Sequence, residues 1–224
     1  DDTERLAARL QAAGVGTIDA PMSGGPARAA DGSMSLMVAC ADAVFETHRA
    51  LIEALSSRLF RIGTRVGDGA RTKLVNNYVA ITLTQVNSEA IALSQRFGLD
   101  LTKTLAVMLG TSANNGQLRM NFANKVLQGD TAPGFTIDLA HKDLSLILGA
   151  AHAARVPMPV AAAVFESYSQ ARANGYELEL VANLTKSVRL SANYAFANAD
   201  AYNAAALTAA YIDRNLSVLR QIVI

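Results

Sequence analysis

The sequence predicts a mainly α-helical chain with a partial α/β layer at its start and a β-hairpin near its end. Short apolar runs alternate with helical patterns over residues 1–66. One long helical pattern and several shorter ones fill residues 67–175, and strict alternation of apolar and polar residues begins after residue 176. These changes of period divide the chain into three expected parts, residues 1–66, 67–175 and 176–224.

In the first part, leucines and alanines at helical spacing predict a helix that stops near Gly14, and Asp42 is expected to cap the next helix. Three short strands accompany these helices, which is too few for a complete doubly wound sheet. The expected elements are a helix over Thr3–Ala13, a strand over Gly16–Ala20, a loop over Pro21–Gly32, a strand over Ser33–Ala39, a helix over Asp42–Leu55 and a strand over Arg58–Ile62.

The middle part is dominated by a predicted helix from Ala70 to Phe97, one face of which stays apolar. At 1.5 Å per residue this helix is about 40 Å long, and a helix of that length usually spans two domains or lies in a subunit interface. Its apolar face contains Val75, Val79, Leu83, Val86, Ala90 and Leu93. Further helices are expected over Leu101–Leu109, Gly116–Leu127, Asp138–Ala154 and Pro159–Ala173.

The last part, residues 176–224, has a different character. Apolar and polar residues alternate over Leu178–Phe196 with Thr185-Lys186-Ser187 between two runs, which predicts a hairpin, and Ala204–Ile224 could return to helix. The alternation weakly resembles a strand pair from the barrel of a TonB-dependent receptor. A soluble hairpin or a poorly ordered extension is the alternative, as is an origin of this part unrelated to the rest.

Composition excludes several classes of protein. The chain has 224 residues, of which 51% are hydrophobic and 17% charged, with a formal net charge of +1, so global disorder and a basic nucleic-acid-binding surface are not expected. Cys40 is the only cysteine and the three histidines are scattered, so we expect neither an intrachain disulfide nor a metal site. There is no long apolar run and the start is acidic, which favours a cytoplasmic protein without a membrane span.

A first segment with chemical potential is DAPMSGG at residues 19–25, where a strand pattern ends in a proline and then two glycines. Glycines allow consecutive backbone N–H groups to converge into an anion nest, and Ser23 adds a hydroxyl donor. Ser23, Gly24 and Gly25 therefore suit a carboxylate or a phosphate. The alternative is an ordinary turn in which these residues serve only the geometry.

A second segment is GDGARTKLVNN at residues 67–77, which lacks the spacing of a P-loop. Lys73 and Asn77 are four residues apart and share one helix face. A desolvated lysine can act as a general acid or base, and Asn77 could hold the same substrate oxygen. The alternative is a solvated lysine with amides on the helix surface. A third segment, residues 135–144, places Lys142 beside Asp143 on an apolar helix, and alone it is weak.

Taken together, these segments resemble the β-hydroxyacid dehydrogenase family, in which D-A-P-x-S-G-G, G-x-G-x-x-x-K-x-x-N-N and K-D-L follow one another. Here they read DAPMSGG at 19–25, GDGARTKLVNN at 67–77 and KDL at 142–144. The resemblance covers about residues 1–175 and is greatest to the 3-hydroxyisobutyrate dehydrogenase, semialdehyde reductase and sulfolactaldehyde reductase branch. It implies a Rossmann-like first part, an all-α second part and a homodimer.

The resemblance also implies a reaction and a set of site residues. The chain would be an NAD(P)-dependent oxidoreductase that interconverts a small hydroxy acid and its semialdehyde, with NAD or NADP as cofactor. Lys73 would be the general acid or base and Asn77 would orient the reacting oxygen. The substrate's acid group would bind Ser23, Gly24 and Gly25, and because Ser-Gly-Gly is kept we expect a carboxylate rather than a sulfonate. Phe135 and Lys142 would line the cofactor.

The family's G-x-G-x-x-G, which binds the dinucleotide pyrophosphate, does not occur before residue 19. We therefore expect this chain to be a truncated dehydrogenase with weak activity. The alternative is a non-catalytic dimerisation fragment of such an enzyme.

Overall fold

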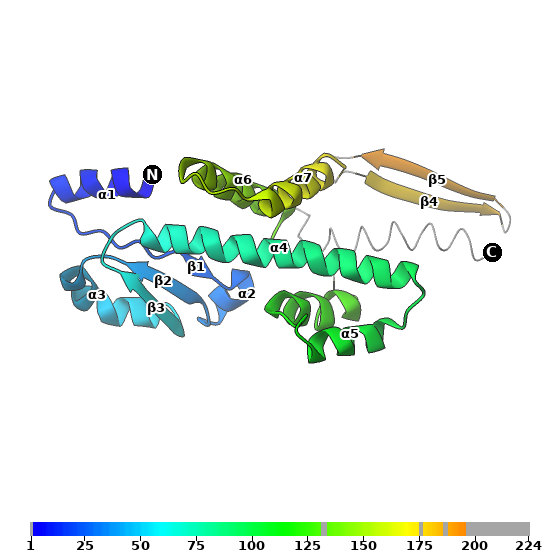
Figure 1. Cartoon of the computed structure of the whole chain (residues 1–224), viewed down its shortest axis with the longest axis horizontal. Helices are drawn as coiled ribbons and strands as arrows, with labels where there is room; N and C mark the ends of the chain where they lie inside the picture. The colour runs from blue at the N-terminus through cyan, green and yellow to red at the C-terminus, as the bar shows by residue number, and fades with distance from the viewer. Residues whose placement is uncertain (1, 131–133, 175–176, 186–187, 196–224) are drawn as a thin grey trace. The chain divides into compact units, whose positions relative to one another are not determined.

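The structure of the protein is a computed structural model, which describes residues 2–130, 134–174, 177–185 and 188–195. The chain divides into two compact units, residues 1–77 and the residues from 78 onward (Figure 1). Helix α4 (Asp68–Arg96) begins in the first unit and continues in the second. The division after residue 66 that the sequence suggests stays a prediction.

The first unit is built on a three-stranded sheet in the order β1-β2-β3. Strand β2 (Ser35–Ala39) pairs in parallel with β3 (Arg58–Gly63) and antiparallel with the short β1 (Met22–Ser23). Helix α3 (Asp42–Ala54) connects the two parallel strands, and α1 (Asp2–Ala12) precedes the sheet. The core of the unit consists of Leu36, Val38, Cys40, Phe45 and Ile52.

Two predictions about this unit are wrong in detail. The expected strand over Gly16–Ala20 forms only an isolated antiparallel bridge between Asp19 and Ala39. The expected loop over Pro21–Gly32 contains β1 and the short helix α2 (Gly25–Ala30), in which Pro26 takes an early position that costs no helical hydrogen bond. A two-residue strand and a six-residue helix are too short to produce a periodic pattern.

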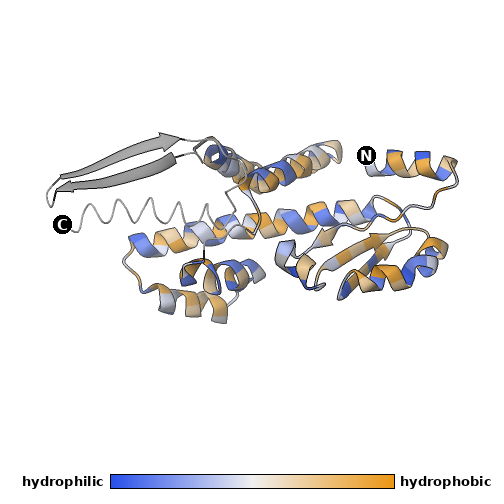
Figure 2. Ribbon diagram, turned by 180° about the vertical axis from the view of Figure 1, so that it is seen from behind, coloured by the Kyte–Doolittle hydropathy of each residue, from blue (hydrophilic) through white to orange (hydrophobic). Residues whose placement is uncertain are grey.

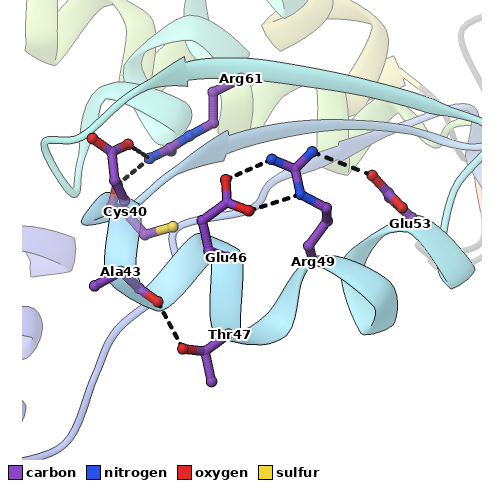
Figure 3. A network of polar contacts seen from close by, with 8 residues as sticks. Cys40, Ala43, Glu46, Thr47, Arg49, Glu53 and Arg61 are labelled. Carbon is purple, nitrogen blue, oxygen red and sulfur yellow. Dashed lines mark hydrogen bonds and ion pairs between the residues drawn. The ribbon is translucent and has the colours of Figure 1, made fainter.

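Arg61 on β3 holds together the end of the parallel strand pair (Figure 3). Its guanidinium donates to the backbone carbonyls of Cys40 and Gly63, pairs with the Asp42 carboxylate at 3.0 Å and lies 4.7 Å from the centre of the Phe45 ring. Asp42 is the first residue of α3 and makes no side-chain cap, contrary to its predicted role, because the N-cap position belongs to Ala41. The Asp42 carboxylate binds Arg61 instead.

The start of α4 approaches β2 closely at Gly69. A Cβ atom at this position would lie 2.6 Å from the backbone oxygen of Met37 and 3.0 Å from Oδ2 of Asp19. Such separations are shorter than any ordinary contact, so only glycine allows the helix to begin at this distance from the strand. The second glycine of the segment GDG, Gly69, is therefore a packing requirement.

The second unit contains most of α4 and the helices that follow it. These are α5 (Leu101–Gly110), a π-helical turn η1 (Leu118–Ala123), a 3₁₀ turn η2 (Val126–Gln128), α6 (Ile137–Ala153) and α7 (Pro159–Asn174). Side chains of Asp100 and Thr136 accept from the N–H groups of Lys103 and Leu139 and cap α5 and α6. One core cluster joins Ile81, Ile137, Ala140, Leu144, Val164 and Tyr168, and a second joins Ile91, Leu118 and Phe122.

The helix expected over Gly116–Leu127 is wrong in type. The chain forms η1 and η2 instead, and Leu118 and Phe122 are fully buried beside Ile91. The oxygen of the Asn115 side chain accepts from the Leu118 N–H at 2.8 Å and from the buried Asn87 amide at 3.0 Å. The Asn115 side chain thus caps the Leu118 N–H and connects the turn to α4, and apolar spacing alone does not reveal either contact.

Hydrophobic and hydrophilic residues are interleaved along α4 (Figure 2). Four residues of the expected apolar face are each about half exposed or more: Val75, Val79, Val86 and Leu93. The buried positions of α4 are Gly69, Asn77, Ile81, Thr84, Asn87, Ser88, Ile91, Ala92 and Ser94. Within the described residues, no helix is long and apolar enough to cross a membrane.

After α7, strands β4 (Glu177–Thr185) and β5 (Val188–Ala195) pair antiparallel, with Glu177 opposite Ala195. This is the hairpin that the alternation predicts. Phe196 and the helix expected over Ala204–Ile224 lie outside the described residues.

We expect Gly69→Ala to lower the free energy of unfolding by about 1–3 kcal/mol, because an added methyl group must displace a strand carbonyl. Gly149, inside α6, has no atom within 4 Å of its would-be Cβ, so Gly149→Ala should be neutral or stabilise by up to about 1 kcal/mol. Chemical denaturation of both variants measures the difference. Equal destabilisation by the two substitutions would contradict this account of Gly69.

Candidate active site

The centre of the candidate site is the carboxylate of Asp19, which lies at the N-terminus of α4. Its Oδ2 accepts from the N–H of Gly67 at 2.8 Å and from the N–H of Ala70 at 3.0 Å. Gly67 occupies the position before the helix but has no side chain to cap it, so Asp19 supplies the cap from another segment. A negative charge here also complements the helix dipole. This contact joins the segment of residues 19–25 to the segment of residues 67–77.

The backbone around Asp19 belongs to the sheet. Its N–H and C=O both bond to Ala39, and the carbonyl of Pro21 accepts from the Met37 N–H. Asp19 is only 7% exposed. Strand β2 therefore positions the carboxylate and, through β1, also the loop that follows.

The loop Ser23–Gly25 comes directly after these bonds. Ser23 pairs with Ser35 in the sheet and is half-buried, whereas Gly24 and Gly25 are exposed. Their φ angles are +145° and +68°, a backbone conformation that side-chain-bearing residues rarely adopt. The two glycines thus permit a tight turn directly after β1. The anion nest at Ser23–Gly25 stays a prediction.

Lys73 and Asn77 lie one and two helical turns after Ala70 on α4. Lys73 is half-buried and Asn77 is 9% exposed. The side-chain oxygen of Asn77 accepts from the amide of Asn76 at 3.2 Å. This bond fixes which end of the Asn77 amide faces Asn76, because only the oxygen can accept.

A cluster of opposite charges surrounds the start of α4. Glu4 of α1 pairs with Arg65 at 2.7 Å and with Arg71 at 2.8 Å, and Arg71 also pairs with Asp68 at 3.0 Å. The hydrogen bonds from Arg71 and then Arg65 lower the pKa of Glu4 to about 2. The cluster fastens α1 to the first turn of α4.

The third segment lies in the second unit. Phe135 is half-buried and packs against the cluster that contains Leu144 and Tyr168. Lys142 is exposed, and its Nζ pairs with Asp143 at 2.7 Å. Ser23–Gly25, Lys73 and Asn77 belong to the first unit, whereas Phe135 and Lys142 belong to the second. The joint role of these residues stays a prediction.

His141 connects α6 to α7. Its Nε2 lies 3.1 Å from Oγ of Ser169, and the Ser169 hydroxyl donates to the carbonyl of Phe165. Since the serine proton is already committed, the imidazole must donate through Nε2. Burial lowers the pKa of His141, and Arg172 lowers it further, which keeps the ring neutral at pH 7.

Two family models match this chain. The model described as the NAD-binding domain of 6-phosphogluconate dehydrogenase matches residues 1–63. The model described as NAD-binding of NADP-dependent 3-hydroxyisobutyrate dehydrogenase matches residues 67–190, more than half of the chain.

The chain belongs to the β-hydroxyacid dehydrogenase family. Among curated relatives, 3-sulfolactaldehyde reductase of Escherichia coli K12 is 38% identical over 85% of this chain and 63% of its own length. L-threonate dehydrogenase of Escherichia coli O6:H1 is 31% identical over 80% of this chain and 59% of its own length. The chain thus spans about three fifths of these relatives.

A solved structure leads to the same family. The crystal structure of 3-hydroxyisobutyrate dehydrogenase from Salmonella typhimurium is 30% identical and superposes with a TM-score of 0.70 over 78% of this chain and 61% of that chain. The expected fold, a Rossmann-like layer followed by helices, is thereby confirmed. The resemblance of the tail to a TonB-dependent receptor finds no support in these matches, and the second family model includes residues 176–190.

Both models describe NAD binding, which confirms NAD or NADP as the cofactor of this β-hydroxyacid dehydrogenase family. The residues present fit such a cofactor in part. The N-terminus of α4 is closed to a pyrophosphate, because the Gly67 and Ala70 N–H groups already bond to Asp19. The exposed ammonium of Lys142 is a donor of the type that fits a dinucleotide.

Sequence reasoning missed Asp19, although it begins the first segment. Its partners lie 48 and 51 residues away, so no local pattern indicates the contact. Two features of the sequence could have indicated the contact: an aspartate at the end of a strand pattern, and a helix preceded by Gly67, which cannot cap it.

We expect Asp19→Ala to reduce the free energy of unfolding by about 1–3 kcal/mol, because two buried N–H groups lose an ionised acceptor. Glu53→Gln is the control, since the Glu53–Arg49 pair is exposed, with a separation of 3.6 Å, and should contribute less than about 1 kcal/mol. Urea denaturation followed by circular dichroism gives both values. A loss for Asp19→Ala no larger than for Glu53→Gln would disprove the anchoring role.

The charge cluster predicts a pH dependence. The pKa of Glu4 falls from 4.5 to about 2 on folding, so its contribution to stability is complete above pH 4.5 and lost as the pH falls toward 2. Glu4→Gln should therefore be less stable than the native protein at pH 6 in low salt, and the difference should vanish near pH 2. Denaturation midpoints across this range measure it. A difference independent of pH would exclude the ionised carboxylate as its cause.

Proposed function

We propose that the protein interconverts a small hydroxy acid that carries a carboxylate and its semialdehyde, with NAD or NADP as the hydride carrier. The observation that carries this proposal is the Asp19 anchor. It ties the acid-binding loop Ser23–Gly25 to the helix that presents Lys73 and Asn77. One frame thus holds an anion site, a proton donor and an amide donor, which are the three groups that reduction of such an aldehyde requires.

Each residue has a distinct role in this proposal. The loop Ser23–Gly25 binds the acid group through neutral donors and so leaves the charge of Lys73 available. Lys73 delivers a proton to the carbonyl oxygen during reduction and removes it during oxidation. The Asn77 amide donates to the same oxygen as negative charge develops on it.

The cofactor, when bound, supplies or accepts the hydride. Phe135 and Lys142 would line the cofactor, as the family resemblance implies. The relatives 3-sulfolactaldehyde reductase and L-threonate dehydrogenase act, as their names say, on 3-sulfolactaldehyde and on L-threonate, and the second of these is a hydroxy acid. Retention of Ser-Gly-Gly supports a carboxylate over a sulfonate. The homodimer and the cytoplasmic location expected from the sequence belong to the same proposal.

We expect Lys73→Met to lower kcat at least about a hundredfold, because it removes the proton donor but keeps most of the stem. Lys103→Met is the matched control, since the Lys103 side chain is 85% exposed, and it should leave kcat unchanged. The assay follows reduction of NAD or NADP by 3-hydroxypropionate and by its sulfonate counterpart, 3-hydroxypropanesulfonate. Turnover by Lys73→Met at the native rate, or a preference for the sulfonate, would refute the proposal.

A second function is favoured by one observation. Val75, Val79, Val86 and Leu93 on α4 are half exposed or more, which suits an assembly module without catalysis. Titration of the purified chain with NADH and NADPH, read by nucleotide fluorescence, separates the two. Saturable binding supports the dehydrogenase. An absence of binding at millimolar nucleotide, with a dimer seen by light scattering, supports the assembly module.

A further inference from the structure

Arg28 lies against the loop to which the proposed function assigns the substrate's acid group. An ideal Cβ built on Gly24 would be 2.8 Å from Cβ, 3.3 Å from Cγ and 2.9 Å from Cδ of Arg28. The stem of Arg28 therefore fills the space over Gly24 that any other residue would need for its own side chain.

Helix geometry explains this placement. Arg28 follows Gly24 by four residues and lies in the last turn of the short helix α2, and helical side chains lean toward the N-terminus over the residue one turn earlier. The guanidinium begins one bond beyond Cδ, the atom that lies 2.9 Å from the position of a Cβ on Gly24. Arg28 is half-buried, which limits the competition from water.

Asp31 is the carboxylate nearest to Arg28 in the sequence, but it makes its hydrogen bond with another residue. Its Oδ1 accepts from the Ser33 N–H at 2.9 Å. Its pKa is lowered chiefly by hydrogen bonds from Ser33, and Arg28 ranks last among the causes. Over the ranges that the structure describes, no carboxylate oxygen lies within 4.0 Å of the Arg28 guanidinium.

Arg61 shows the contrast within the same unit. Its guanidinium donates to two backbone carbonyls, pairs with Asp42 and lies over Phe45, so its donors serve the fold. The Arg28 stem touches the anion loop, and its planar fork of N–H groups is the type that binds a carboxylate through two parallel hydrogen bonds.

We propose that Arg28 is a specificity-determining residue, which binds the acid group of the substrate together with the Ser23–Gly25 loop. This inference rests on the proposed function for the identity of the loop. It adds a cation to the acid-binding loop, whose own donors, the Ser23 hydroxyl and backbone N–H groups, are neutral. The site thereby discriminates an acid from a neutral compound of the same size, because the charge of the guanidinium contributes only when the ligand is an anion.

The test measures binding without turnover. The full chain, labelled with ¹⁵N, is titrated with 3-hydroxypropionate and with 1,3-propanediol, its neutral counterpart, and the amide signals of Gly24 and Gly25 report the affinity. Arg28→Met keeps the stem over Gly24 but removes the charge, and Arg28→Lys keeps the charge but not the fork. Arg9→Met changes an exposed arginine of α1 and serves as the control.

We expect Arg28→Met to weaken binding of 3-hydroxypropionate about tenfold or more, Arg28→Lys to weaken it less, and Arg9→Met to have no effect. Binding of 1,3-propanediol should be equally weak in all four proteins. Native affinity for the acid in Arg28→Met overturns the inference, as does native protein that does not bind the acid.

The two failures are distinguishable. If the acid binds through Arg28 but the native protein never reduces NAD or NADP, the proposed function fails and the inference stands. If the native protein turns over and Arg28→Met has an unchanged KM for the acid, the inference fails and the proposed function stands.

Discussion

The contact between the Asp19 carboxylate and the first turn of α4 is the interaction on which the rest of the candidate site depends. The residue before α4 is Gly67, which has no side chain to cap the helix, and a buried helix end without a cap would leave N–H groups unsatisfied. Asp19 supplies the missing acceptor from the edge of the sheet. The same contact requires glycine at position 69, because a side chain there would clash with both Asp19 and the Met37 carbonyl.

Much of this organisation could be predicted from the sequence, and the parts that could not have physical causes. Period and spacing predicted the helices α4, α6 and α7 and the strands β2 and β3, because long helical patterns and short alternating runs depend on local sequence. The candidate residues Ser23, Lys73 and Asn77 come from two segments that are each weak alone, and their proposed roles come from the family resemblance. The predictions that are wrong concern short elements. They are the single β-bridge at Asp19, the helix α2, and the π-helical turn η1 after Asn115.

Polar contacts between distant segments were beyond prediction for a different reason. Asp42 has the character of a helix cap, but Arg61 on a neighbouring strand binds its carboxylate. Asn87 lies in a helix where its propensity is poor, and its partner Asn115 is 28 residues away. In each case the residue type indicates that the side chain makes a polar contact. The partner is distant in sequence, so it can be identified only once the fold is known.

The external cap on α4 also determines which changes of length the chain can absorb. Counting from Ala70, Lys73 and Asn77 follow at fixed steps of one helix, so a single residue inserted between them and Gly67 would turn both side chains about 100° around the axis. On the strand side, an insertion between Asp19 and Ser23 would shift the loop against β2 and reverse the face that each side chain occupies. The connection between α3 and β3, residues 55–57, lies outside both of these spacings. Length variation should therefore accumulate there, while the spacings within residues 19–25 and 67–77 stay fixed.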